Sequence, residues 1–503
     1  MESVTIQFDK ESSIPMYIQL SKHIGMLIKE GKYNENEKLP TIRKLAASIN
    51  VNNVTVVNAY KNLERKGYIK SMVGSGYYVT YKEHDVITTS EEEDDSFLEY
   101  DNINLMSKGQ LKVCKNTINF ASANPDPSQF PVEDFKRAIN EVLDRDKGLA
   151  FGYQESKGYK PLRSSFTQFL KKYMDVEVAP EDLQIVSGAQ QGIDIISKAL
   201  INPEDYVITE NPTYTGALSV FKGRGANIIG VDVNIRGINL SDLERKIVTY
   251  NPKLIYVMTK FQNPTTISYS QDTLEKLLDL ANKYNVYIVE DDSLSGLNYM
   301  QEDNKINLKA LDKNNKVIYV KSFSKLLMPG LRIGFIAYPP EMQEQIIKAK
   351  HSTDISSSGL IQRAMQLYLD NGNLEKHVEF MKKIFKKKYD CMNTELKALR
   401  KYGVNFIAPR GGLHFWIKLP KGVNALELYS RCSQRDVLIV PCNIFYVNPL
   451  GAANNTIRLS FAAVDEEGII KGLNILKKEL IYLLKCDNEY SEVHEEATLS
   501  PMI

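Results

Sequence analysis

Hydrophobic positions near the start of the chain recur at helical spacing in three separate stretches. Between Pro15 and Gly31, apolar residues return every three to four positions, which predicts an amphipathic helix with both of its ends marked. A short helix is expected from Thr41, and a third helix from about Asn53 to Lys66. Only a tight connection separates the second and third helices, so the pair predicts a helix-turn-helix.

Two strand-like runs follow the third helix. Residues 68–73 and 77–80 flank the turn Gly74-Ser-Gly76, which indicates a β-hairpin, or wing. Residues 1–80 are therefore expected to form a winged helix domain that binds DNA. The apolar face of the third helix leaves polar side chains to present elsewhere, as contacts to base edges and phosphates: Asn53, Thr55, Asn58 and Lys61.

The pattern changes after residue 80. Residues 81–115 lack sustained periodicity and contain the acidic run 91–95, so we expect a flexible acidic linker. Over residues 116–485, strand-like runs alternate with helical patterns, which predicts an α/β domain with a doubly wound, mostly parallel sheet. The strand-like runs are residues 183–186, 206–209, 254–257, 286–289, 317–320, 333–336, 413–418 and 456–460. From roughly residue 345 this domain is expected to continue as a smaller α+β domain. Residues 486–503 are expected to form a disordered acidic tail.

Composition narrows the class of protein. With 503 residues, 43% of them hydrophobic, the chain is expected to form at least two globular domains. The net charge of +1 hides a contrast, because residues 1–80 carry 11 Lys and Arg against 7 Asp and Glu, whereas residues 81–103 carry 1 against 9. Five scattered cysteines, no export signal and no long apolar run indicate a cytoplasmic protein outside the membrane, with no metal site.

Residues suited to ligand binding follow successive strands of the predicted sheet, where open α/β sheets bind ligands. Backbone amides of residues 187–191 could hold a phosphate, and Tyr214 could stack on an aromatic ring. Asn263 could donate to a phenolate oxygen, and Asp291 could pair with a ring nitrogen. Each alone has an ordinary structural explanation, such as helix packing, a core tyrosine, a turn or a helix cap.

Lys325 adds the reactive group. Ser322 and Ser324 stand beside it and Arg332 follows a glycine turn, so an amine, two hydroxyls and a guanidinium could gather around a phosphate. Pyridoxal phosphate has both an aldehyde for the amine and a phosphate. An isolated lysine in this setting would more often be an exposed residue at a strand end, but the order of the other residues after successive strands argues for a cofactor site.

Two resemblances follow from these motifs. Residues 116–485 resemble fold-type I pyridoxal phosphate enzymes of the aminotransferase class. The first 80 residues resemble the winged helix of GntR-type regulators, through Leu39-Pro-Thr-Ile-Arg-Lys-Leu-Ala46 and the wing glycines. The fusion of the two resembles the MocR branch of GntR regulators.

The resemblance implies a role for each position. Lys325 would form the internal aldimine, Asp291 would contact N1 of the ring, Asn263 would contact O3′, and Tyr214 would stack on the ring. The phosphate would be held by Ala189, Gln190, Ser322, Ser324 and Arg332. Arg458 would bind the substrate carboxylate, and Tyr153 would reach the site of a neighbouring subunit. DNA contacts would come from Arg43, Asn53, Thr55, Asn58 and Lys61, with Gly74 and Gly76 in the wing.

Some positions depart from the family pattern. Ser293 and Leu294 stand where a tyrosine that binds O3′ is usual, which puts efficient turnover in doubt. Thr266 and Cys442 each replace a residue that is often glycine. Such differences favour a changed ligand pocket.

These features favour a transcription regulator that binds a double-stranded DNA operator as a homodimer. Its aldimine site would sense a small amine, an amino acid or pyridoxal phosphate itself, and would change DNA binding by linkage. The first alternative is an active aminotransferase whose winged helix is vestigial or autoregulatory. The second is a DNA-binding protein that uses the large domain only to dimerise.

Overall fold

The computed structural model describes residues 16–29, 31–49, 51–65, 68–72, 76–80, 116–299, 306–449 and 454–496. The chain divides into two compact units, residues 1–94 and residues 95–503. The linker expected at residues 81–115 and the wing residue Gly74 lie outside the described residues.

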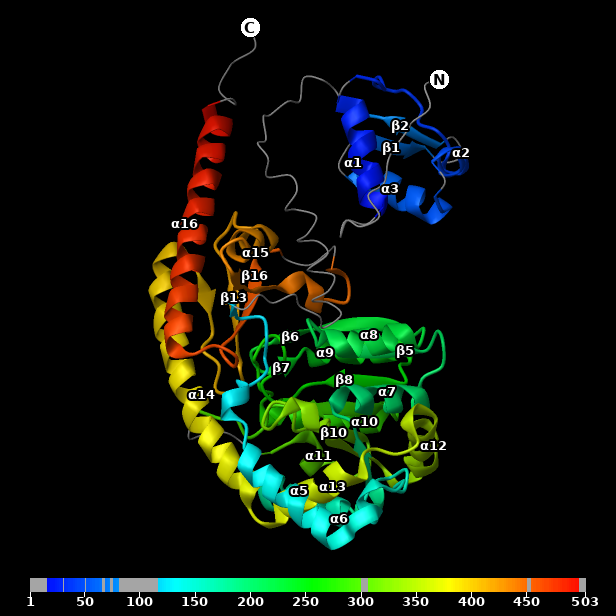
Figure 1. The fold of residues 1–503 in the computed structure, drawn as a ribbon, viewed down its shortest axis with the longest axis vertical. Coiled ribbons are helices and arrows are strands. Elements are labelled where there is room, and N and C mark those ends of the chain that lie inside the picture. The colour runs from blue at the N-terminus through cyan, green and yellow to red at the C-terminus, as the bar shows by residue number, and fades with distance from the viewer. Residues whose placement is uncertain are drawn as a thin grey trace. The chain divides into compact units, whose positions relative to one another are not determined.

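The first unit contains the three helices and the hairpin expected of a winged helix (Figure 1). They are α1 (Met16–Lys29), α2 (Ile42–Ser48), α3 (Asn53–Arg65), β1 (Ile69–Met72) and β2 (Gly76–Val79). Thr41 caps α2, because its hydroxyl accepts a hydrogen bond from the Lys44 amide at 3.4 Å. The expected apolar face of α3 is buried, and the Tyr60 hydroxyl donates to the Pro40 carbonyl at 2.7 Å. This packing fixes α3 against the segment that leads into α2.

An eight-stranded sheet lies at the centre of the second unit, in the order β4-β11-β10-β9-β8-β5-β6-β7. The five strands from β10 to β6 in this order run parallel, β11 is antiparallel to β10 and β4, and β7 is antiparallel to β6. The expected mostly parallel sheet is therefore confirmed. Its strands are β4 (Leu183–Val186), β5 (Tyr206–Asn211), β6 (Asn227–Asn234), β7 (Gly237–Ile238), β8 (Leu254–Val257), β9 (Tyr287–Asp292), β10 (Val317–Ser322) and β11 (Gly334–Ala337).

Helices cover both faces of this sheet because successive strand residues point in opposite directions. In β10, Ile318 and Val320 join the core that includes residues of α7, α8 and α12, whereas Tyr319 joins the core with α5, α6 and α13. Val317 joins a further core with α9 and α10. These helices are α5 (Val132–Asp146), α6 (Lys160–Met174), α7 (Ala189–Leu200), α8 (Thr215–Gly223), α9 (Leu240–Tyr250), α10 (Gln271–Tyr284), α12 (Gln343–Asp354) and α13 (Gly359–Asp370), with the short α11 at Leu308–Leu311.

A smaller four-stranded sheet, in the order β12-β13-β16-β15, forms a second layer with its own core. The long helices α14 (Asn373–Ala398) and α16 (Glu466–Glu496) lie side by side against it (Figure 1). The other elements are β12 (Asn405–Phe406), β13 (His414–Lys418), α15 (Ala425–Ser433), β15 (Val440–Pro441) and β16 (Thr456–Ser460), with β3 (Ile118–Asn119) paired in parallel with β14 (Val437–Leu438). This is the expected smaller α+β domain, but it takes up the chain from α14 rather than from residue 345, because α12 and α13 pack against the large sheet.

The expected end of the folded domain also differs from the structure. α16 continues to Glu496, so residue 485 lies within a helix and the first part of the expected disordered tail is helical. Residues 473–496 contain neither glycine nor proline, so nothing in the sequence ends the helix where its charge changes. Residues 497–503 lie outside the described residues. None of the helices in the described parts of the chain combines the length and hydropathy needed to span a bilayer.

Candidate functional site

A cavity of about 480 Å³ lies where several strands of the large sheet end and where β13 and β16 of the small sheet approach them. It is lined by all ten residues that we expected to bind a cofactor or the substrate carboxylate: Ala189, Gln190, Tyr214, Asn263, Asp291, Ser322, Ser324, Lys325, Arg332 and Arg458. Parallel strands bring their carboxyl ends to one edge, so residues far apart in the sequence meet there. The structure therefore places these ten residues together.

Lys325 lies just after β10, and its Nζ donates to Asn124 Oδ1 at 2.9 Å. Burial, together with the positive charges of Arg458 and Arg332, lowers the pKa of Lys325 to about 8. A lysine with such a pKa is partly neutral near physiological pH. It is therefore suited to attack a carbonyl carbon.

The end of the cavity that we expected to hold the phosphate is formed by the turn that starts α7. Arg332 donates through Nη2 to the Ser187 carbonyl, and a Cβ placed on Gly188 would lie only 2.9 Å from that same nitrogen. Glycine is thus required for the guanidinium to lie against the turn, and Gly188 also has a φ of +85°. The first amides of α7 have no partners within the helix and can bind an anion. Ser322 and Ser324 add two hydroxyls, which lie 3.2 Å apart.

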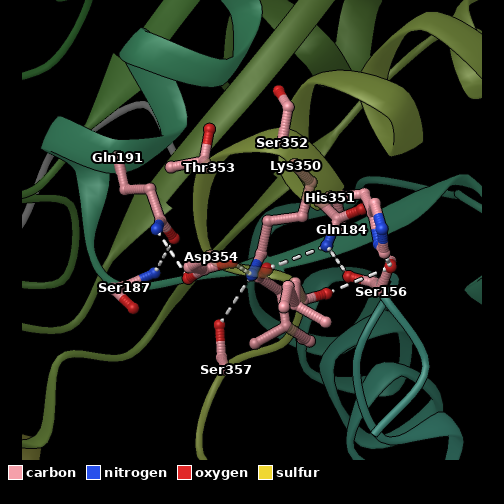
Figure 2. A network of polar contacts seen from close by, with 12 residues as sticks. Ser156, Gln184, Ser187, Gln191, Lys350, His351, Ser352, Thr353, Asp354 and Ser357 are labelled. Atoms are coloured by element: carbon pink, nitrogen blue, oxygen red, sulfur yellow. Dashed lines mark hydrogen bonds and ion pairs between the residues drawn. The ribbon is translucent and has the colours of Figure 1, made fainter.

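A network of polar contacts supports the turn that starts α7 (Figure 2). The Gln191 side chain accepts from the Ser187 amide at 2.7 Å and donates to Asp354 at 2.8 Å. Asp354 in turn pairs with Lys350, whose side chain is fully buried and also donates to Ser357 at 3.1 Å. The turn that can hold a phosphate is therefore tied to the end of α12.

Asp291, the next-to-last residue of β9, also lines the cavity. Its carboxylate accepts from the Tyr256 hydroxyl at 2.6 Å and from the Ser293 hydroxyl at 3.2 Å. Burial raises the pKa of Asp291 to about 6, so the group is mostly ionised at neutral pH. Asp291 forms no ion pair with any residue that the structure describes, which leaves this carboxylate able to pair with a cationic ring nitrogen. Ser293, which stands where the family pattern usually has a tyrosine, here donates to Asp291.

Tyr214 and Asn263 also line the cavity. Tyr214 precedes α8, and its hydroxyl donates to Gln190 Oε1 at 3.2 Å. Asn263 Oδ1 accepts from Arg458 Nη1 at 2.9 Å, and Arg458 Nη2 donates to the Ala121 carbonyl at 2.7 Å. Arg458 Nε is buried and has no partner among the described residues. An unpaired donor on a buried cation favours an anionic ligand.

The donor set fits pyridoxal phosphate. Lys325 suits the aldehyde, the α7 turn with Arg332 suits the phosphate, and Asp291 suits the ring nitrogen. Bound there, the cofactor would supply an electrophilic carbon and an electron-withdrawing ring. Arg458 then remains at the edge of the site for a carboxylate.

Two departures from the family pattern have structural consequences. Thr266 has a φ of +66°, a conformation that favours glycine and is unusual for a β-branched residue. Cys442 is buried beside β15, and its pKa is raised well above the ordinary value because of that burial. Neither lines the cavity around Lys325.

Tyr153 does not line this cavity in its own chain. It is 86% exposed, in a loop that follows a 3-10 helix, η3 (Lys147–Phe151). Leu149 and Phe151 beside it are also largely exposed. The loop is held by Ser156, which contacts His351 at 3.2 Å and the Ile355 carbonyl at 3.1 Å (Figure 2).

In the first unit the expected DNA contacts are only partly described. Arg43 on α2 and Asn53 and Lys61 on α3 are exposed, and Thr55 is half-buried. The side chain of Asn58 and the whole of Gly74 lie outside the described residues. Gly76 begins β2 with a φ of +112°, a conformation that favours glycine.

Among the residues in or beside the cavity that the sequence analysis missed, three bear on its chemistry: Asn124, Tyr256 and His414. Asn124, which accepts from Lys325, is itself the asparagine of an Asn-Pro step, and that step was the available signal. Tyr256 lies within a strand that we expected, but its contact with Asp291 depends on the pairing of β8 with β9. His414 lies in another expected strand, and nothing in the sequence pattern marks it as a cavity residue.

Comparisons with known proteins match both units. The family "Aminotransferase class I and II" matches residues 115–476, and "Bacterial regulatory proteins, gntR family" matches residues 16–79. Aromatic-amino-acid aminotransferase 1 of Thermococcus litoralis is 32% identical over 376 residues, which cover 74% of this chain and 89% of that protein.

A second relative matches nearly the whole chain, including both units. The uncharacterized HTH-type transcriptional regulator YdfD of Bacillus subtilis is 30% identical over 484 residues, which cover 94% of this chain and 98% of that protein. Among solved structures, LysN, an alpha-aminoadipate aminotransferase from Thermus thermophilus complexed with N-(5'-phosphopyridoxyl)-L-leucine, matches with a TM-score of 0.70 and 29% identity. That match covers 78% of this chain and 100% of LysN. The chain therefore belongs to the class I and II aminotransferase family, which binds pyridoxal phosphate, and is a GntR-family transcription regulator of the MocR-type architecture, in which a DNA-binding helix-turn-helix is fused to an aminotransferase domain.

Proposed function

We propose that the aminotransferase domain is the sensor of this regulator. It holds pyridoxal phosphate through an aldimine at Lys325 and takes a small amine or amino acid as its effector, or senses the cofactor itself. Binding then changes the affinity of the winged helix for its operator. Asp291, Asn263 and Tyr214 hold the ring, and the α7 turn with Ser322, Ser324 and Arg332 holds the phosphate.

The observation that carries this proposal is that one cavity is lined by both sheets of the domain. Lys325 and Asp291 come from the large sheet, whereas Arg458 comes from the small one. A ligand that contacts both sheets stabilises the arrangement that binds it better, and an effector shifts an equilibrium only through such a difference in affinity. The hydrogen bond between Arg458 and Asn263 is one contact that an incoming carboxylate would change.

A visible absorption spectrum tests the proposal directly. The purified full chain, reconstituted with pyridoxal phosphate, should show a protein-bound cofactor band, which Lys325→Ala should abolish. Candidate amines and amino acids should shift this band and should change the affinity for operator DNA over the same concentration range. A wild-type spectrum identical to that of Lys325→Ala, or DNA binding that no cofactor or amine changes, would contradict the proposal.

An active aminotransferase is the second candidate, because the cavity contains the lysine, the carboxylate and the arginine that transamination uses. The same spectra separate the two. Conversion of the cofactor to pyridoxamine phosphate, followed by regeneration with a keto acid, supports the enzyme. A shifted band that persists supports the sensor.

We further propose that the chain forms a homodimer through the surface that carries Tyr153. Leu149, Phe151 and Tyr153 are each at least 70% exposed, and such apolar groups cluster at interfaces. A dimer also supplies two reading helices for paired half-sites. Sedimentation of Phe151→Asp should show a monomer, whereas an unchanged dimer would exclude this surface.

A further inference from the structure

His414 lies on the side of the cavity that the small sheet supplies. It begins β13, and Trp416, two residues later, pairs with Arg458 on β16. Residues two apart on a strand point to the same face, so His414 and Arg458 lie on one face of this sheet. Both line the cavity that also contains Lys325.

The imidazole has no role within the protein that the described residues reveal. His414 is 2% exposed, and its Nδ1 is buried without a hydrogen-bond partner in the described parts of the chain. Buried polar atoms in folded proteins nearly always have partners. The structure describes no cluster of His, Cys, Asp or Glu that could make it a metal ligand.

The charges around His414 indicate what its partner would be. Burial lowers the pKa of His414 well below its ordinary value, and the cations Arg458 and Lys325 act in the same direction. The ring is therefore neutral, with one N–H that can donate. Asp291 is the one acidic residue among those that line the cavity, and it is already bonded to Tyr256 and Ser293.

Arg458 leaves room for a second donor to the same carboxylate. Each of its terminal nitrogens already donates one hydrogen bond to the protein, to Asn263 and to Ala121, which leaves one N–H on each of them and the unpaired Nε–H. A carboxylate has about four acceptor positions, so a second donor on the same face of the sheet adds to its binding.

We propose that His414 is a specificity-determining residue, whose imidazole donates a hydrogen bond to the carboxylate that Arg458 receives, so that the cavity prefers amino acids to simple amines. The proposal rests on the proposed function, in which this cavity takes a small amine or amino acid. It goes beyond that function because it assigns the choice between the two ligand classes to a residue of the small sheet.

Three probes that share one five-carbon chain, and differ in whether it carries an amine, a carboxylate or both, test it. L-norleucine has an amine and a carboxylate, pentylamine has only the amine, and hexanoate has only the carboxylate. Titration of the full chain loaded with pyridoxal phosphate gives affinities for the two amines by visible absorption, and isothermal titration calorimetry gives the affinity for hexanoate. His414→Leu should lower the affinity for L-norleucine and for hexanoate about tenfold, as expected for the loss of one hydrogen bond to a charged group. The affinity for pentylamine should stay within about twofold of the wild-type value.

His414→Asn is the matched control, because an amide can donate from nearly the position of Nδ1. It should keep most of the affinity for L-norleucine and hexanoate. Equal weakening of all three probes in His414→Leu would indicate a merely structural role and overturn the proposal, as would unchanged binding of all three. If the wild type binds hexanoate in a His414-dependent manner but neither amine shifts the spectrum, the proposed sensing of amines fails and the carboxylate contact stands.

Discussion

Arg458 and Asn263 are joined by a hydrogen bond of 2.9 Å that fixes the orientation of the asparagine amide. Because Oδ1 accepts from the guanidinium, Nδ2 is the atom left to donate to a ligand in the cavity. In the proposed complex, Arg458 would thus determine which atom of Asn263 meets the cofactor. Ligand binding at Arg458 and the electronic state of the cofactor would then be linked through one side chain.

Asn263→Asp should change the titration of the bound cofactor. An aspartate still accepts from Arg458 but cannot donate to the phenolic oxygen, so the cofactor binds its proton more tightly. The midpoint of the pH-dependent visible transition should rise by about one unit or more. Asn211→Ala is the control, because Asn211 also precedes a proline but does not line this cavity. An unchanged midpoint in Asn263→Asp would exclude the contact.

The lowered pKa of Lys325 predicts how cofactor capture depends on pH. Only the neutral amine attacks an aldehyde, so the rate at which the apoprotein gains the cofactor band should rise with pH and level off above about 8. In Arg458→Gln the midpoint should move to higher pH, because Arg458 is the nearby charge that lowers this pKa most. Rates measured between pH 6 and pH 10 give both midpoints. The exposed Arg245 provides a control substitution, and a midpoint that does not move in Arg458→Gln would contradict this account.

Much of the fold and most of the cavity can be predicted from the sequence, for a physical reason. Parallel strands are buried on both faces and appear as short apolar runs, so their ends can be located without knowing the tertiary structure. The residues that follow those ends, such as Asp291 and Lys325, must then meet at one edge of the sheet. The helices of the winged helix can also be located from the sequence, because Pro15, Thr41 and Gly31 mark helix ends.

The remaining residues depend on pairings that no local pattern specifies. Tyr256 reaches Asp291 only because β8 lies beside β9, and His414 faces Arg458 only because β13 pairs with β16. The half-buried strand β6 carries no continuous apolar run and was not among the expected strands. The network behind the α7 turn joins Gln191 to Asp354, 163 positions away, so only the folded chain reveals it.

The contacts that Asp354 makes with Gln191 and Lys350 predict that two substitutions in this network lower the stability of the protein by different amounts. Asp354→Ala removes the carboxylate beside Lys350, whose side chain is fully buried, and should destabilise the protein by about 3 to 5 kcal/mol. Lys350→Met leaves a carboxylate that is 27% exposed and still accepts from Gln191, so its cost should be about 1 to 2 kcal/mol. Urea unfolding of the two variants measures the difference.

Cofactor affinity provides a second readout of the same network. Loss of Asp354 also removes a hydrogen-bond partner of Gln191, whose side chain accepts from the Ser187 amide in the turn that starts α7. We therefore expect Asp354→Ala to bind pyridoxal phosphate about tenfold more weakly. Lys350→Met leaves that link in place and should bind the cofactor normally. Equal losses of stability in both variants, with equal cofactor affinity, would show that the network does not support the turn.

Substitutions of two exposed residues of α3 should distinguish contacts with DNA phosphates from contacts with base edges. Lys61→Ala should weaken binding to operator and unrelated DNA alike and should reduce the salt dependence by about one phosphate contact, because a lysine contacts the backbone as a point charge. Asn53→Ala should reduce the free energy of binding to the operator by about 1 to 3 kcal/mol, because the amide of an asparagine can contact base edges. The affinity for unrelated DNA should not change. Fluorescence anisotropy at several salt concentrations measures both effects, and Lys276→Ala, which changes an exposed lysine of the aminotransferase domain, is the control. If Lys61→Ala left the salt slope unchanged, or Asn53→Ala weakened all DNA equally, the face of α3 assigned to DNA would be wrong.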